Sequence, residues 1–395
     1  MINRSAVRTL RVNTMSIPSL LSAGTGFWDK FQDVVNILTG PAYFVTLATI
    51  VFVLMIVAYK FWTKPLVAFL LLLGFCAFYF GSMANKDYRA TVTKPDNVPI
   101  TIMVLSVMVC IWITFRRAAI NDTRSAAGQP YLEEDKDDKV LVWPDLVYTE
   151  LICLIAATAL LTIWAIIAKA PLEQPATPNY APNPAKAPWY FLGLQEMLVY
   201  FDPWMAGVVY PGLIIVGLCA IPFIDTNPKG NGYYTLKERP FAISTFLFGF
   251  LILWVVLIFF GTFLRGPNWS FFGLYEAWDP HKPEALNNVD VSNLWWNVIM
   301  HRSRPTADNN PIGVLPFWLV REWFGIVLVF GYFLITPAIL KATAFKRMYE
   351  NMGGIRFTIM VILLLFMAMM PIKMVLRWLF NMKYFVYLPE FNANL

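Results

Sequence analysis

Long apolar runs separated by short polar stretches make up most of this chain. A helix that crosses the hydrocarbon layer of a membrane needs about 20 apolar residues. Eight runs approach or exceed that length, at 42–62, 66–83, 98–115, 147–169, 204–224, 241–264, 314–340 and 355–380. The pattern predicts an all-α polytopic membrane protein with about eight transmembrane helices.

Composition supports the same fold class. Hydrophobic residues form 58% of the 395 residues and charged residues only 14%, whereas soluble domains carry roughly 25% charged residues. The net charge of +6 arises from basic residues at the ends of the apolar runs, which is a topology signal of membrane proteins. We therefore exclude a soluble enzyme and a nucleic-acid-binding protein.

Polar stretches divide the chain into regions. The run from Glu133 to Lys139 is typical of a solvated connection and ends the first group of spans. The predicted regions are an N-terminal segment (1–40) with an amphipathic interfacial helix from Phe27 to Leu38, a three-span region with the charged linker (41–140), a central region (141–265), an aromatic-rich loop (266–312), and two further spans with a tail (313–395).

A proline-rich stretch between two apolar runs is the feature that carries chemistry. Residues 171–203 hold seven prolines, so the stretch cannot be a membrane span. Non-helical backbone at membrane depth survives only where protein buries it or where it lines a cavity. The stretch therefore predicts either a lid over an apolar pocket or a surface loop with interfacial aromatic residues. We expect a short helix at Trp189–Tyr200, with Pro188 at its first position.

Several short motifs in this part of the chain resemble the C-terminal half of cytochrome b, which is a separate chain (subunit IV) in split complexes. They are Trp143-Pro-Asp, then a span, then Leu172-Glu-Gln-Pro-Ala, then Pro188-Trp-Tyr-Phe. The resemblance covers roughly residues 140–265. It implies a subunit of a quinol:cytochrome c oxidoreductase of the cytochrome bc type, in which the lid carries part of the quinol-oxidation site.

The chain departs from the family at one position. In the family's Pro-Glu-Trp-Tyr motif the glutamate accepts a proton from quinol, and here Pro188 stands in its place before Trp189. Glu196 lies two helical turns after Trp189, and we expect it to accept the proton instead. The alternative is that Glu196 caps the lid or forms a salt bridge in it, for example with Lys186. Glu173 and Asp202 are weaker candidates.

The other expected site residues surround this carboxylate. The resemblance implies that the Tyr190 hydroxyl binds a quinone oxygen and that Trp189 packs beside it. Apolar side chains on the same helix are expected to form the pocket wall. The expected set is Glu196 and Tyr190 as catalytic residues, with Trp189, Tyr190, Phe191, Leu194 and Met197 binding quinol.

No haem is expected on this chain alone. A haem between transmembrane helices needs two axial histidines at membrane depth, but His281 and His301 both lie between spans. The resemblance therefore implies partner subunits: a cytochrome b N-terminal half with haem b, a Rieske iron–sulfur protein and a cytochrome c-type subunit. It further implies a dimeric complex, in contact with lipid, in an energy-transducing membrane such as the bacterial inner membrane.

Basic residues also predict the topology. Loops 60–64, 116–139, 229–239 and 341–356 form the basic side, which places the lid and the 265–312 stretch on the electropositive side. Two other functions stay open from the sequence. One is a transporter or channel subunit with the proline-broken segment as a re-entrant gate. The other is a structural subunit whose quinol site has degenerated.

Overall fold

The computed structural model describes residues 26–134, 140–168, 172, 175–179, 181–227, 233–282 and 288–395. In this part of the chain, seven helices are long and apolar enough to cross a membrane. An eighth span results if α3 (Phe27–Leu38) and α4 (Pro41–Val57), which meet at 83°, count as one bent span. The predicted all-α polytopic fold is confirmed.

The spans follow the predicted apolar runs closely. They are α6 (Pro65–Ser82), α8 (Asn97–Ala126), η1 (Val142–Leu146) with α9 (Val147–Ile167), η2 (Met205–Val209) with α11 (Tyr210–Ile224), the continuous helix of α12 (Pro240–Leu247), η3 (Phe248–Val255), α13 (Val256–Phe259) and η4 (Phe260–Leu264), then α15 (Phe317–Ala342) and α17 (Gly354–Phe380).

Short elements connect the spans or follow the last one. They are α5 (Tyr59–Trp62), α7 (Lys86–Val92), α10 (Trp189–Met197), η5 (Pro267–Trp269), β1 (Val289–Asp290), α14 (Val291–Asn293), η6 (Leu294–Ile299), α16 (Lys346–Met352), β2 (Met382–Tyr384), β3 (Tyr387–Leu388), η7 (Pro389–Phe391) and β4 (Ala393–Asn394).

The first predicted span differs from the prediction. Helix α4 ends at Val57, Ala58 leaves the helical conformation, and α5 adds only four residues. At 1.5 Å per residue, α4 is about 26 Å long, slightly less than the hydrocarbon thickness. A helix with the bounds expected for the interfacial helix is present as α3, and it turns sharply away from α4 at Gly40.

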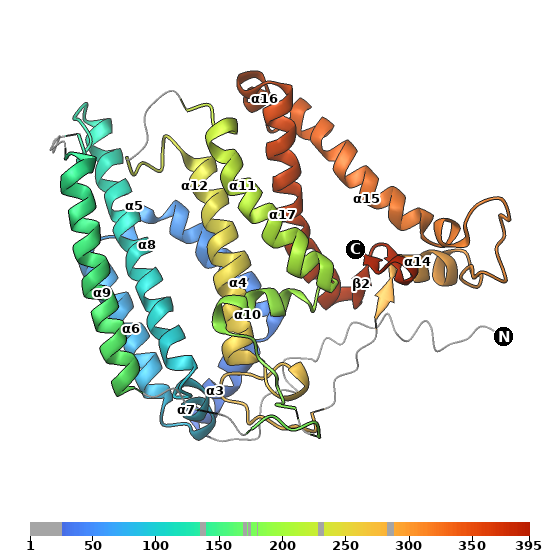
Figure 1. Ribbon diagram of the computed structural model, residues 1–395, viewed down its shortest axis with the longest axis horizontal. Coiled ribbons are helices and arrows are strands. Elements are labelled where there is room, and N and C mark those ends of the chain that lie inside the picture. Colours follow the sequence, from blue (N-terminus) through green and yellow to red (C-terminus); the bar gives the residue numbers. More distant parts are fainter. Residues whose placement is uncertain are drawn as a thin grey trace.

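The spans have a common direction that separates two sides of the molecule. Figure 1 shows α8, α9, α11, α12 and α17 running alongside one another, with α16 at the upper edge and α3, α7 and α10 in the lower half. Basic residues lie in the last turns of α8 and α15, at the upper edge. The lid helix α10 therefore lies toward the side opposite the basic connections, as the topology argument expects.

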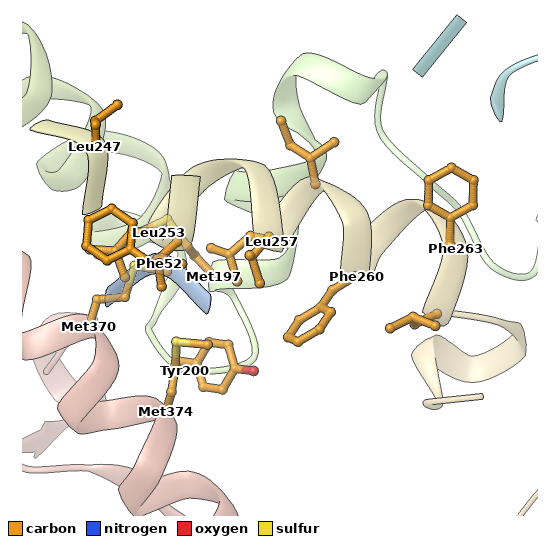
Figure 2. Close-up of a cluster of buried hydrophobic side chains, with 14 of the residues drawn as sticks. Phe52, Met197, Tyr200, Leu247, Leu253, Leu257, Phe260, Phe263, Met370 and Met374 are labelled. Atoms are coloured by element: carbon orange, nitrogen blue, oxygen red, sulfur yellow. The ribbon is translucent and has the colours of Figure 1, made fainter. Parts of the chain in front are cut away.

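The core lies where the lid, the Pro240–Leu264 helix and α17 meet. Figure 2 shows Leu257 and Phe260 from that helix facing Met370 and Met374 from α17, with Met197 and Tyr200 of the lid among them. The Pro240–Leu264 helix is the most buried span, because 39% of its apolar 18-residue stretch is buried. In the Val142–Ile167 span, no residue of the corresponding stretch is buried. One span thus organises the fold, and α9 presents apolar side chains on all sides.

A polar cluster fixes the C-terminal segment to α15. Arg321 donates hydrogen bonds to Glu390 at 2.8 and 2.9 Å and to Glu322 at 3.0 Å, and Glu322 also accepts one from Arg304 at 2.8 Å. Strand β1 pairs in parallel with β2, and β3 pairs antiparallel with β4. The backbone of Phe385 comes so close to α15 that only a glycine fits at Gly325.

We expect Gly325→Ala to destabilise the protein. The added Cβ would lie 1.9 Å from the carbonyl oxygen of Phe385, so the C-terminal segment must move away from α15. Overpacking of this kind costs about 1–3 kcal/mol. Gly331→Ala on the same helix is the control, because its Cβ would meet Ile335 at an ordinary 3.6 Å. Thermal unfolding in detergent measures both, and equal melting temperatures for the two variants would contradict the prediction.

Candidate functional site

Helix α10 lies directly against the most buried span. Leu192, which is 2% exposed, packs on Gly261, where a Cβ atom would come within 2.6 Å of the Leu192 side chain. Gly193 faces the backbone of Trp254 and the side chain of Ile258 at ordinary contact distances. The glycine at 261 therefore permits a helix-to-span approach that any other residue would prevent.

The entry into α10 is fixed by one side chain. Gln195 accepts a hydrogen bond from the Ala187 N–H at 2.8 Å and donates one to the Ala185 carbonyl at 2.8 Å. Pro188 is extended and precedes the helix, which begins at Trp189, so the expected position of Pro188 inside the helix is wrong by one residue. The helix ends at Met197, earlier than predicted, and a turn follows to Tyr200.

A buried ion pair joins the far end of α10 to the end of the span. Arg265 donates from Nε to Glu196 Oε2 at 2.9 Å and from Nη2 to Oε1 at 2.7 Å. The Glu196 side chain is fully buried, and that of Arg265 is 8% exposed. Arg265 also donates to the Trp269 carbonyl at 2.8 Å. Glu196 thus forms a salt bridge, but its partner is Arg265 at the end of the span and not Lys186 of the lid.

Two further contacts tie the lid to the same region. The Lys186 ammonium group donates to the Thr262 carbonyl at 2.9 Å and lies 5.0 Å from the Trp278 ring. Asn183 exchanges hydrogen bonds with Asn268, at 2.9 and 2.6 Å.

Burial, reinforced by repulsion from Lys94, lowers the pKa of Lys186 to about 7. The amine of Lys186 is therefore poised to gain or lose a proton near neutral pH.

The expected site residues divide between the two ends of α10. The first turn is exposed, with 42%, 48% and 53% of Trp189, Tyr190 and Phe191 accessible. Tyr190 contacts Trp189 and Phe191 edge to face, with ring centroids 5.6 and 4.8 Å apart. Leu194 is half-buried. Glu196 and Met197 in the last turn are buried, and Met197 belongs to the core rather than to the exposed aromatic face.

The weaker candidates lie elsewhere. Asp202 accepts hydrogen bonds from the Tyr384 hydroxyl at 2.9 Å and from Asn394 at 3.2 Å, so it holds the C-terminal segment. Glu173 lies outside the described residues. His281 and His301 are exposed and lie outside the spans. The described residues contain no cluster of histidine, cysteine, aspartate and glutamate that is suited to a metal ion.

Sequence reasoning missed the residues that position the lid. The sequence analysis gives Arg265 no role, although a fully buried carboxylate such as Glu196 requires a cation nearby. Gln195 carried no signal for its contacts to the preceding loop, because a glutamine on a short helix has many equally plausible partners. The low pKa of Lys186 depends on burial that the sequence does not reveal.

Comparison with known proteins identifies this region. The family model described as cytochrome b (C-terminal)/b6/petD matches residues 175–276, about a quarter of the chain. The matched stretch contains the lid from Pro175 onward, including α10, and the Pro240–Leu264 span with the beginning of its following loop. No solved structure matches the chain. The suspected resemblance is confirmed over this region, while Trp143 and α9 lie outside the match.

We expect Arg265→Gln to destabilise the protein strongly. It leaves the Glu196 carboxylate buried without its partner, and breaking a buried pair costs about 3–5 kcal/mol. Arg239→Gln is a matched control, because Arg239 pairs with Asp225 at 2.6 Å but both side chains are 30% exposed. Loss of an exposed pair costs about 1 kcal/mol or less. Similar decreases in unfolding temperature for both variants would show that the Glu196–Arg265 pair does not hold the lid.

Proposed function

We propose that this chain, with its cytochrome b-type region at residues 175–276, is a membrane subunit of a quinol:cytochrome c oxidoreductase and forms part of the quinol-oxidation site. The observation that carries the proposal is the arrangement of α10. Its first turn presents three aromatic side chains outward, while a buried ion pair holds its last turn against the most buried span.

The exposed aromatic turn suits a quinol ring. Trp189 and Phe191 offer apolar surface on either side of Tyr190, and Leu194 extends it along the helix. The structure gives no hydrogen-bond partner to the Tyr190 hydroxyl among the described residues, so this group is free to bind a quinone oxygen. Met197 lies in the hydrophobic core, on the side of α10 away from this exposed aromatic surface. Pockets for such ligands are mostly apolar with few polar groups.

Oxidation of quinol releases two electrons and two protons, so the site needs a proton acceptor. In this proposal Glu196 takes the place of the family's motif glutamate, which Pro188 replaces. Arg265 occupies one lone pair of each Glu196 oxygen, and a second lone pair on each oxygen remains. Lys186, with a pKa of about 7, is a second group in the lid that can exchange a proton at neutral pH.

Partner chains complete the proposed site. The aromatic turn of α10 is exposed in this chain alone, and the apolar residues of α9 have no burial here. A haem-bearing cytochrome b N-terminal half would cover these surfaces, and the Rieske protein and a cytochrome c-type subunit would receive the electrons on the lid side. A dimeric complex in an energy-transducing membrane, such as the bacterial inner membrane, is the setting that this function requires.

We expect Glu196→Gln to reduce quinol-dependent cytochrome c reduction by the purified native complex roughly a hundredfold, the scale of losing a general base. The variant also leaves Arg265 unpaired, so lost stability must be separated from lost chemistry. The double variant Glu196→Gln/Arg265→Gln removes both charges and should recover much of the thermal stability while turnover stays low.

The double variant decides between the two roles of Glu196. Recovery of turnover together with stability would mean that Glu196 is only a clamp, and the proton-acceptor assignment would fail. Lys186→Met would then be the next variant, with loss of a kinetic pKa near 7 as its signature. A preparation with neither quinol activity nor a b haem would overturn the proposed function as a whole.

We expect Tyr190→Phe to lower kcat/KM for quinol roughly three- to tenfold, the effect of one lost hydrogen bond, without changing the melting temperature. The side chain is half exposed, so its removal leaves no buried group unsatisfied. Tyr148→Phe is the matched control, because Tyr148 is similarly exposed on α9, outside the proposed site. An unchanged kcat/KM in the Tyr190 variant would remove this hydroxyl from the site.

A further inference from the structure

A basic cavity lies between α5 and α8, in the N-terminal group of helices and away from the lid. Its volume is about 350 Å³. Three cationic side chains line it together with the exposed face of the last turns of α8. The lining residues are Lys60, Arg116, Ala119, Ile120, Thr123, Arg124, Ala127 and Gln129.

Two of the three cations that line this cavity, Lys60 and Arg116, keep their positive charge uncompensated in the part of the chain that the structure describes. Neither Lys60 nor Arg116 forms an ion pair within the described residues, and Arg124 donates from Nε to the Pro130 carbonyl. Asp122 is turned away and accepts a hydrogen bond from the Tyr59 hydroxyl at 2.7 Å. Glu133 is engaged by Arg117 and Asn121. The cavity is therefore suited to an anion.

The cations stand at the boundary between apolar and polar parts of a span. Arg116 directly follows the apolar run of α8, and Lys60 lies on α5, the short helix that follows α4. Tryptophans mark the same level: Trp112 donates to the Thr63 carbonyl at 3.2 Å and Trp62 to the Met55 carbonyl at 2.8 Å. Such aromatic residues are typical of the membrane–water interface. The cavity thus lies at the depth of lipid phosphates, on the basic side of the protein.

Exposed apolar side chains continue from the cavity toward the membrane interior. Val109 and Ile113, 48% and 44% exposed, lie on the α8 face of Arg116 by their spacing along the helix. Val57 and Phe61, 74% and 61% exposed, flank Lys60. A polar head above a strip of apolar surface matches the shape of a phospholipid, whereas a free inorganic anion would make no use of the apolar strip.

We propose that this cavity binds the headgroup of an anionic phospholipid, with the lipid phosphate contacted by Lys60 and Arg116 and the acyl chains lying along the exposed apolar residues of α8, α5 and the end of α4. Basic pockets between transmembrane helices on the cytoplasmic side bind anionic headgroups in this way. The lipid would join α5 to α8 and so stabilise the N-terminal helices. This inference is independent of quinol chemistry.

The test is native mass spectrometry of the delipidated protein, with any co-purifying subunits, titrated with dioleoylphosphatidylglycerol. We expect one molecule to bind at concentrations at least tenfold below those needed for dioleoylphosphatidylcholine. Lys60→Gln/Arg116→Gln should weaken binding at least tenfold. Lys64→Gln/Lys346→Gln removes the same charge from exposed positions outside the cavity and should leave binding within about threefold. Lys60→Arg/Arg116→Lys, which keeps both charges, should retain binding.

Three results would overturn the proposal. Equal losses in the two glutamine pairs would show that only the overall surface charge attracts the lipid. Displacement of the phospholipid by an equal concentration of inorganic phosphate would show a free-anion site that does not use the acyl chains. Equal binding of phosphatidylcholine would show that the cations do not select the ligand. Melting temperatures without added lipid verify that each variant is folded.

Discussion

The position of the lid depends on one buried ion pair. Glu196 and Arg265 are 69 residues apart in the sequence and meet through two hydrogen bonds, with Glu196 fully buried. Two charges taken out of water are tolerable only while they remain together, because either one alone carries its full desolvation cost. This constraint fixes α10 against the end of the Pro240–Leu264 span. Gly261 allows the same close approach of α10 to the span, and the hydrogen bonds of Lys186 and Asn183 hold the preceding part of the lid to the same region.

The same constraint gives α10 two different ends. Its last turn is locked into the core between two spans, while its first turn carries exposed Trp189, Tyr190 and Phe191. An exposed apolar surface on a helix that is firmly packed at its other end is the arrangement expected of one side of a binding site whose other side belongs to another chain. The span that precedes the lid, α9, is likewise uncovered in this chain, since no residue of its apolar stretch is buried. In the proposed function, partner subunits supply the missing burial.

The sequence predicted those features that depend on composition over many residues. Apolar length located the spans, and the amphipathic pattern of α3 gave its bounds. It did not predict the break at Ala58, because the apolar run continues across it. Nor did it predict that Arg265 would pair with Glu196 or that Met197 would enter the core, since both depend on how a nine-residue helix crosses a distant span. The family match confirms the motif-based resemblance only for residues 175–276.

The replacement of the motif glutamate by Pro188 has a structural consequence for the proposed chemistry. A carboxylate at position 188 would precede the exposed aromatic turn, whereas Glu196 lies behind it and is held by Arg265. A proton can therefore bind Glu196 only at the lone pairs that Arg265 leaves open, or after one of the two hydrogen bonds from Arg265 breaks. Arg265 also donates a hydrogen bond to the Trp269 carbonyl, in the loop that follows the span. In the proposed function, proton uptake by Glu196 would therefore weaken a pair whose guanidinium group also holds this loop.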